Sequence, residues 1–180
     1  YTLTETTGQQ EGLEVRLSPT GAYRLFGVPM HELANRTHLL SVVAPPWRQD
    51  LVDRLLDAPD WGARFRLTEH HLANRLHGPA PDAEVAWARR QFRQTHGQLP
   101  ISALVTELGW SHARLVRRFR EQIGVTPKQC ARLLRFQQVV KAPSFAPGAD
   151  WCALAHAGGF YDQSHLIREA SSICWLKRER

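Results

Sequence analysis

The chain has 180 residues, of which 43% are hydrophobic, and it carries a formal net charge of +6. This length suits one domain or two small ones, and the sequence has no run of about 18 apolar residues that could span a membrane. Its cysteines, Cys130, Cys152 and Cys174, are odd in number and widely spaced. The spacing argues against a disulfide framework and a zinc site and predicts three partly buried thiols in a reducing cytoplasm.

The positive charge is confined to the second half of the sequence. Residues 1–82 contain 8 Lys and Arg against 10 Asp and Glu, a balance of −2, whereas residues 83–180 contain 15 against 7, a balance of +8. A basic segment joined to a nearly neutral one is typical of a polyanion-binding module attached to another region. Because many basic proteins bind no nucleic acid, the charge is only a weak argument for such a partner.

The first half of the sequence predicts one strand and then short helices. Residues 13–17, LEVRL, alternate apolar and polar side chains as a half-buried strand does. Ser18 followed by Pro19 favours a helix start, and Gly27 favours its end. A short helix is predicted after Pro29. Two further helices are predicted from apolar side chains that share a helical face: Leu51, Val52, Leu55 and Leu56 in one, and, after a cap at Asp60, Trp61, Phe65, Leu72 and Leu76 in the other.

A stretch with two prolines and a glycine, HGPAPD at residues 77–82, is typical of a linker and coincides with the change in charge. After it, Asp82 is predicted to cap a helix that ends near Gly97. The inward side chains of that helix should be Val85, Ala88 and Phe92. The rest of the sequence predicts helices alone.

Two segments of the second half repeat one pattern, SALVTELGWSHARLVRRF at residues 102–119 and CALAHAGGFYDQSHLIREA at residues 152–170. Ser111, Leu115 and Arg117 of the first copy correspond to Asp162, Leu166 and Arg168 of the second, each 51 positions later. Each copy predicts a helix, a glycine-containing turn, a Ser or Asp cap and a second helix. That order is the helix-turn-helix pattern, whose second helix enters the major groove of DNA. The two units span about 101–124 and 151–171.

A helical wheel separates two faces of the second helix in each copy. Leu115 and Phe119 define the inward side at 100° per residue, and Arg117 lies roughly opposite, where its guanidinium can donate two hydrogen bonds to guanine. The outward positions are Ala113, Arg114, Arg117 and Arg120 in the first copy, and Gln163, Ser164 and Arg168 in the second. An ordinary solvated face of an amphipathic helix is the alternative. The matched caps, leucines and arginines of two copies argue against it.

The segment between the copies predicts one connecting helix, capped by Thr126 and running from Pro127 to about Lys141, with Leu133, Leu134 and Phe136 on its apolar side. About 14 residues at 1.5 Å each can separate two DNA-reading helices by roughly 20 Å, so that adjacent major grooves are within reach if the DNA bends. Arg118 lies nearer the core side and is expected to meet phosphate or solvent. Weaker candidates for phosphate contact are Ser111, His112, Lys128, Arg132 and Arg135.

Residues 83–170 resemble the DNA-binding domain of the AraC/XylS family of bacterial transcription regulators. The two segments that carry the resemblance are LVTELGWSHARLVRRFREQIGVTPKQCARLLRF and LAHAGGFYDQSHLIRE. The pattern GF-x-D-Q-S-H-L-x-R in the second segment is close to the family signature. The resemblance implies a mostly α fold with two helix-turn-helix subdomains joined by a linker helix. It also implies that Arg117 and Arg168 read bases. The neighbouring groove-facing positions that it implies are Ala113, Val116, Ser164 and Ile167.

The chain departs from the family pattern after residue 169. Ala170 stands where Phe119 stands in the first copy, and SSICWLKRER lacks the family's glycine and proline. A missing aromatic side chain predicts a hole in the core of the second copy, which Ile173 or Trp175 could partly refill. The second copy is therefore expected to be the less stable one.

The segment RLSPTGAYRLFGVPMHELANR is similar to the last strand and the following helices of a sensor domain in one branch of the family. The resemblance implies that residues 1–78 are a partial, mostly helical sensor or dimerisation region with a short strand. Residues 79–82 are then the linker, and residues 83–180 the DNA-binding domain. Residues 1–17 are too few for the small β-barrel that binds effectors in such sensors. We therefore expect no effector site within residues 1–82.

Two classes of function remain open from the sequence. One is a sequence-specific DNA-binding transcription regulator that reads adjacent major grooves, and the other is a helical protein–protein adaptor whose basic helices pair with acidic partners. The sequence has no P-loop, G-x-S-x-G or H-E-x-x-H motif, so no enzyme activity, metal or cofactor is expected. Expected partners are double-stranded DNA and, as further candidates, RNA polymerase and a second copy bound through the N-terminal region. We expect the protein at the nucleoid in the cytoplasm, without a membrane partner.

Overall fold

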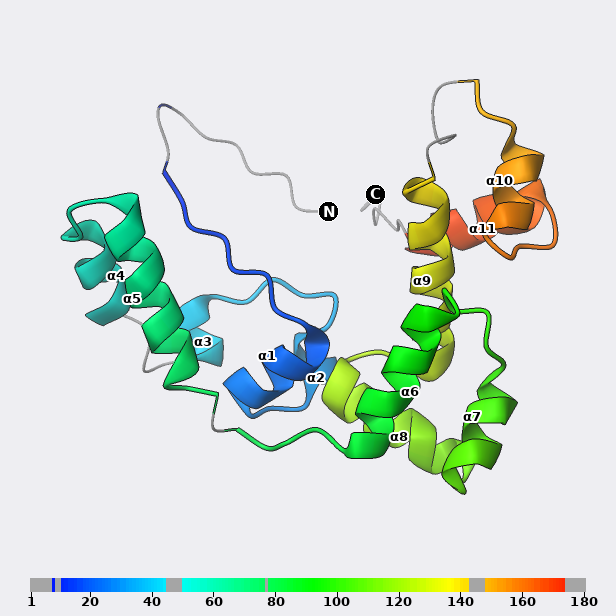
Figure 1. Cartoon of the computed structure of the whole chain (residues 1–180), viewed down its shortest axis with the longest axis horizontal. Coiled ribbons are helices and arrows are strands. Elements are labelled where there is room, and N and C mark those ends of the chain that lie inside the picture. The colour runs from blue at the N-terminus through cyan, green and yellow to red at the C-terminus, as the bar shows by residue number, and fades with distance from the viewer. Residues whose placement is uncertain (1–7, 9–10, 45–49, 77, 143–147, 174–180) are drawn as a thin grey trace, which may run out of the picture. The chain divides into compact units, whose positions relative to one another are not determined.

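The computed structural model describes residues 8, 11–44, 50–76, 78–142 and 148–173. These residues form eleven α-helices and no strand, which confirms the mostly α class (Figure 1). The helices are α1 (Pro19–Phe26), α2 (Met30–Leu33), α3 (Leu40–Val43), α4 (Asp50–Leu56), α5 (Trp61–Ala73), α6 (Ala83–Gln94), α7 (Ile101–Leu108), α8 (His112–Ile123), α9 (Pro127–Val140), α10 (Trp151–Ala157) and α11 (Gln163–Ile173).

The chain divides into two compact units. One contains residues 17–87 and 110–126, and the other contains residues 1–16, 88–109 and 127–180 as far as they are described. Residues 110–126 thus pack with the first half of the chain rather than with the rest of the second half. This grouping differs from the boundary predicted at residues 79–82. The assignment of a sensor region before that boundary and a DNA-binding domain after it stays a prediction.

Helix α1 begins and ends where its sequence predicts. The Ser18 hydroxyl accepts a hydrogen bond from the Gly21 amide at 3.0 Å, Pro19 occupies the first turn, and Gly27 adopts the left-handed conformation with φ 67°. The strand predicted over residues 13–17 is wrong, because these residues are neither helix nor strand. Alternation of side chains is a local signal, whereas a strand also needs a partner, and the described residues supply none.

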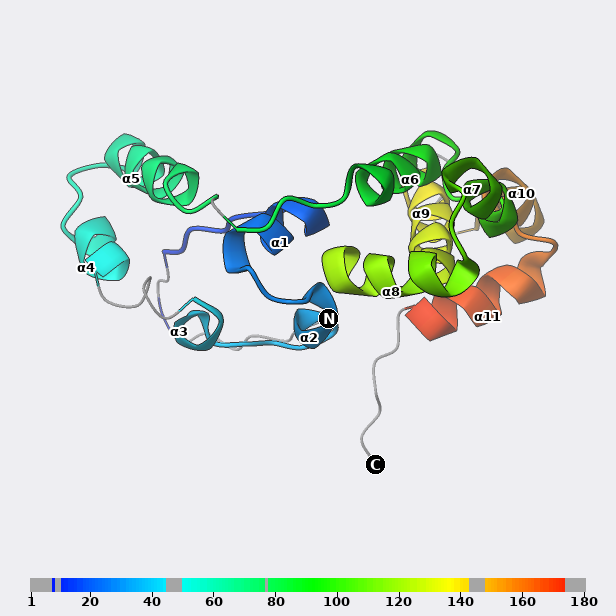
Figure 2. The same ribbon diagram turned by 90° about the horizontal axis from the view of Figure 1, so that it is seen from below.

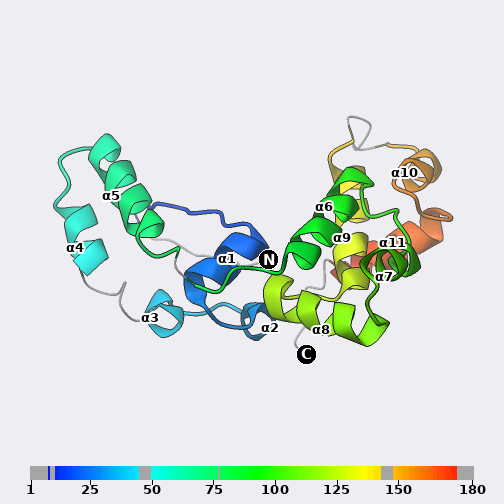
Figure 3. The same cartoon turned by 60° about the horizontal axis from the view of Figure 1, so that its bottom comes forward.

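Helices α4 and α5 pack against each other, but over a narrower stripe than predicted (Figure 3). Leu51 is buried against Ala44, and Leu55 and Leu72 pack onto that cluster. The prediction is wrong for four apolar side chains that lie exposed, namely Val52 (45%), Leu56 (72%), Trp61 (40%) and Phe65 (54%). The buried side chains of the two helices are those that pack onto the cluster of Ala44 and Leu51.

In the other unit, α10 and α11 both contact α9 (Figure 1). Their buried cluster consists of Val139, Leu154, Ala155, Phe160 and Leu166, with Phe136 packed against it. Ala170, at the position that lacks the family's aromatic residue, is half-buried and lies outside this cluster. The prediction that this copy is the less stable one is therefore still a prediction. The side chains of Ile173 and Trp175 lie outside the described part of the chain.

The inward face of α9 differs from the predicted one. Leu133 is 36% exposed, whereas the small side chains of Cys130 and Ala131 are buried at 7% exposure. The reason is a close backbone approach, because a Cβ atom on Gly97 would overlap the carbonyl of Ala131. Only a face of small side chains permits this approach.

The cysteines are not alike in environment. Cys130 is buried, and burial raises the pKa of its thiol to about 11. Cys152 is exposed, so the prediction of a partly buried thiol is wrong at this position. Cys174 lies outside the described residues.

Candidate nucleic-acid interface

Helix α8 has the boundaries that its capping residues predict. Gly109 ends α7 in the left-handed conformation with φ 62°, and the Ser111 hydroxyl then accepts a hydrogen bond from the Arg114 amide at 3.2 Å. Gly124, with φ 93°, ends α8. These caps satisfy free backbone groups at both ends and fix which residues lie in the first turn.

The inward side of α8 is apolar and fully covered. Leu115 and Phe119 have no exposed surface, and Ile123 is 8% exposed. Helices α1 and α2 both contact α8 (Figures 2 and 3). The carbonyl of Met30 comes so close to Gly124 that a Cβ there would lie 3.0 Å from the oxygen. The inward side chains were predicted correctly, whereas the contacts of α8 with α1 and α2 were not predicted.

The opposite side of α8 is exposed and positively charged. Ala113, Arg114, Arg117 and Arg120 are exposed, and Val116 is half-buried. Arg114 is held in place, because its guanidinium carbon lies 4.3 Å from the centre of the Trp110 ring. Trp110 itself is only 8% exposed. The sequence carries one signal for this contact, a tryptophan four residues before an arginine, and it was not among the predictions.

Arg118 does not belong to this exposed face. Its guanidinium donates to both carboxylate oxygens of Asp82, from Nε at 2.6 Å and from Nη2 at 2.5 Å, and to Glu121 at 2.7 Å. The expectation that Arg118 meets phosphate or solvent is therefore wrong. Side chains that are only a quarter or so exposed (28% for Arg118 and 23% for Asp82) form a strong two-bond pair.

The same pair fixes the start of α6. The hydrogen bonds from Arg118 are the largest of the effects that lower the pKa of Asp82. The Asp82 amide donates to Oε1 of the fully buried Gln122 at 2.8 Å, and the Tyr23 hydroxyl donates to Glu121 at 3.4 Å. Asp82 was predicted as a helix cap, and its carbonyl does accept the Ala86 amide at 3.0 Å. Its carboxylate, however, pairs with Arg118.

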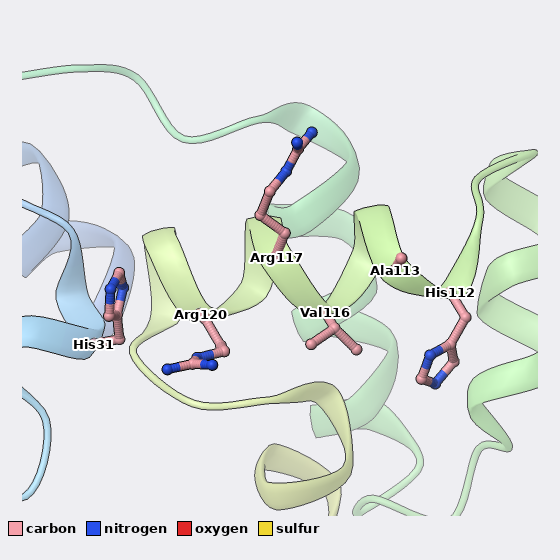
Figure 4. A pocket seen from close by; sticks show the side chains of 6 residues that line it. All are labelled: His31, His112, Ala113, Val116, Arg117 and Arg120. Atoms are coloured by element: carbon pink, nitrogen blue, oxygen red, sulfur yellow. The ribbon is translucent and has the colours of Figure 1, made fainter.

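A hollow of about 580 Å³ lies on the exposed side of α8; we call it the α8 hollow. Its lining residues are His31, His112, Ala113, Val116, Arg117 and Arg120 (Figure 4). Figure 4 shows His31 of α2 beside Arg120 at one end of α8, His112 at the other end, and Arg117 extending away from the side of the helix that carries Arg120 and His112. The lining contains no acidic side chain. Nothing in the sequence indicated that His31 lines this hollow, because its place there depends on how α2 packs against α8.

The second predicted unit has matching local features. Asp150 caps α10 by accepting the amides of Cys152 and Ala153, and Asp162 caps α11 by accepting the His165 amide at 2.6 Å. Leu166 is buried at 1% exposure. Ser164, Ile167 and Arg168 are exposed, and Gln163 is half-buried. Thus α11 exposes Ser164 and Arg168 on the side opposite Leu166, whereas the outward position predicted for Gln163 is wrong, because three residues before Leu166 it lies on the same side of the helix.

The weaker phosphate candidates fall into two groups. Ser111, His112 and Lys128 are exposed, although the Ser111 hydroxyl already serves as a cap. Arg132 is ion-paired with Glu169, and the guanidinium carbon of Arg135 lies 5.6 Å from the centre of the Phe160 ring. These two arginines connect α9 to the second repeated segment, residues 152–170. A contact with phosphate would therefore compete with contacts that each arginine makes inside the protein.

Comparisons with known proteins add no relative: no family model matches the chain, and neither a curated protein nor a solved structure is significantly similar to it. Within the described ranges, no group of three His, Cys, Asp or Glu side chains could hold a metal ion. No helix of that part of the chain is long and apolar enough to cross a membrane.

Proposed function

We propose that this protein is a sequence-specific DNA-binding transcription regulator of the AraC/XylS type. In this proposal α7 with α8, and α10 with α11, are two helix-turn-helix units, and α8 and α11 are their recognition helices. The observation that carries the proposal is the exposed face of α8. It presents three exposed arginines on a helix that is capped at both ends, next to a hollow without acidic lining.

The geometry and charge of α8 support this role. A recognition helix reads base edges with residues near its N-terminus while its other face is held in the protein core. Leu115 and Phe119 provide that attachment, and small Ala113 permits close approach to the bases. Arg117 extends from this helix with no ion pair to any described residue. In our proposal it donates two hydrogen bonds to guanine O6 and N7.

Helix α11 repeats this role with different side chains. Arg168 corresponds to Arg117, and Gln163 can donate to and accept from adenine. Ile167 is 48% exposed, which suits contact with a thymine methyl group. Exposed Lys128 and His112, by contrast, are proposed to contact phosphates, which position the protein without reading sequence.

The first prediction separates base reading from phosphate binding. Arg117→Ala should lose discrimination at one base pair of a duplex selected from a random pool, by about 1–3 kcal/mol. Lys128→Ala should weaken binding to selected and random duplexes alike, because its proposed contact is to phosphate. Both effects can be measured by fluorescence anisotropy against a set of single-base-pair variants of the selected duplex.

The exposed Arg66 on α5 supplies the matched control. Arg66→Ala removes the same charge from a helix outside the proposed interface and should change neither affinity nor discrimination. Equal weakening of selected and random duplexes by Arg117→Ala would show that Arg117 does not read a base.

A further inference from the structure

The basic surface of α8 continues onto residues 31–36, although residues 1–82 carry a net charge of −2. Arg120 and His31 both line the α8 hollow, and both also line a neighbouring hollow together with Arg36. All three side chains are exposed. We call these three residues the α2–α8 basic cluster. It joins the C-terminal end of α8 to the segment that contains α2.

The packing of α2 against α8 holds His31 beside Arg120 (Figure 4). Met30, directly before His31, is only 5% exposed. A Cβ atom on Gly124, the residue that ends α8, would lie 3.0 Å from the carbonyl oxygen of Met30. Because the two backbones approach so closely at this point, α2 keeps His31 at the C-terminal end of α8.

The arginines of the α2–α8 basic cluster have no acidic partner inside the protein. Neither Arg36 nor Arg120 makes an ion pair with any residue that the structure describes. The lining of the α8 hollow contains no acidic side chain, and that of the neighbouring hollow contains one, Glu32. Exposed guanidinium groups without an internal partner are suited to bind phosphate oxygens.

The α2–α8 basic cluster lies at the opposite end of α8 from the residues nearest its N-terminus, where a recognition helix reads bases. Arg120 comes seven positions after Ala113. At 1.5 Å per residue, these two residues are about 10 Å apart along the helix axis, or about three base-pair steps of 3.4 Å. The cluster is therefore placed to meet the DNA backbone beyond the bases that the start of α8 would read.

We propose that the α2–α8 basic cluster binds the DNA phosphates that flank the bases read by α8. The DNA interface then extends beyond residues 83–180 into the N-terminal half of the chain. This inference rests on the proposed function of α8. Phosphate contacts add affinity and position the protein, but they carry no sequence information. The cluster should therefore affect affinity and salt dependence and leave the discrimination between base pairs unchanged.

The test measures binding of the full chain to two fluorescent duplexes by anisotropy. Both carry the same selected site, and the longer one is extended at each end by about one helical turn, about 10 base pairs. Arg36→Gln should weaken binding to the longer duplex severalfold and reduce the steepness of its salt dependence by about 0.9, with little effect on the shorter duplex. Adding His31→Gln should weaken binding further. Glu32→Gln should strengthen it, because the variant removes the one carboxylate beside the cluster. The matched control Arg66→Gln, on α5, should change neither affinity nor salt dependence.

The outcomes separate this inference from the proposed function. Wild-type binding that Arg36→Gln and Glu32→Gln both leave unchanged on the longer duplex would overturn the flanking contact and leave the proposed function standing. Altered discrimination between single base pairs in Arg36→Gln would also overturn it, because a phosphate contact carries no sequence information. Absence of wild-type binding to either duplex would refute the proposed function, and the flanking contact with it. A gain of affinity in Glu32→Gln distinguishes loss of charge from damage to the fold, since a damaged fold would not bind more tightly.

Discussion

Gly97→Ala is expected to destabilise the protein by about 2–5 kcal/mol. Two penalties add at this position: residue 97 has φ 77°, a conformation that disfavours side chains with a Cβ, and the new Cβ would overlap the carbonyl of Ala131. Relief of the overlap would require the backbones at Gly97 and Ala131 to move apart, and because Ala131 is buried this movement would disturb the packing around it. The loss can be measured by urea denaturation followed by circular dichroism.

Gly109→Ala separates the two penalties. Gly109 has a similar φ of 62°, but a Cβ there would have nothing within 4 Å. This control should lose only the conformational contribution, about 1 kcal/mol. If Gly97→Ala and Gly109→Ala cost the same, the close approach between Gly97 and Ala131 is not as the structure has it.

The second large effect is expected at the Asp82–Arg118 pair. Asp82→Asn should lower the free energy of unfolding by about 2 kcal/mol at pH 7, because it removes charge-assisted hydrogen bonds from a guanidinium that is mostly covered. The pKa of Asp82 is lowered in the folded state. Its contribution is therefore present above the carboxyl's ordinary pKa of about 4 and is lost as the pH falls through the lower folded value.

Urea denaturation of both proteins at several pH values checks this expectation. The stability difference between wild type and Asp82→Asn should be largest near neutral pH and should shrink as the pH falls below about 4. Asp53→Asn, an exposed carboxylate on α4, serves as the control and should show little difference at any pH. A difference for Asp82→Asn that persists unchanged into acid would contradict an ionised Asp82–Arg118 pair.

The features that sequence predicts well here are local. The caps at Ser18, Ser111 and Asp162 each depend on one side chain and the amide three residues later, and the structure has all three. The inward positions of Leu115 and Phe119 are also correct, because the apolar stripe of an amphipathic helix packs toward the protein core. From these features the sequence could assign the exposed side of α8.

The features that sequence misses depend on distant parts of the chain. The buried face of α9 is set by the approach of Gly97 to Ala131, and the role of Arg118 is set by Asp82, 36 positions earlier. The packing of α8 against α1 and α2 brings His31 to the α8 hollow. Neither periodicity nor residue type could show these pairings, because each requires the tertiary fold. The alternation of apolar and polar side chains in residues 13–17 predicted a strand wrongly for the same reason, because a strand also depends on a partner elsewhere in the fold.

The most direct test of the central claim, that the exposed face of α8 binds DNA, is a salt titration of duplex binding by the full chain. Fluorescence anisotropy should give a logarithm of the binding constant that falls linearly with the logarithm of salt concentration, with a slope of about −0.9 for each phosphate contact. The double variant Arg117→Glu with Arg120→Glu should lose most of this binding, whereas Arg66→Glu should retain it. A slope near zero, or equal binding by the double variant and the wild type, would contradict the claim and favour a helical adaptor for acidic protein partners.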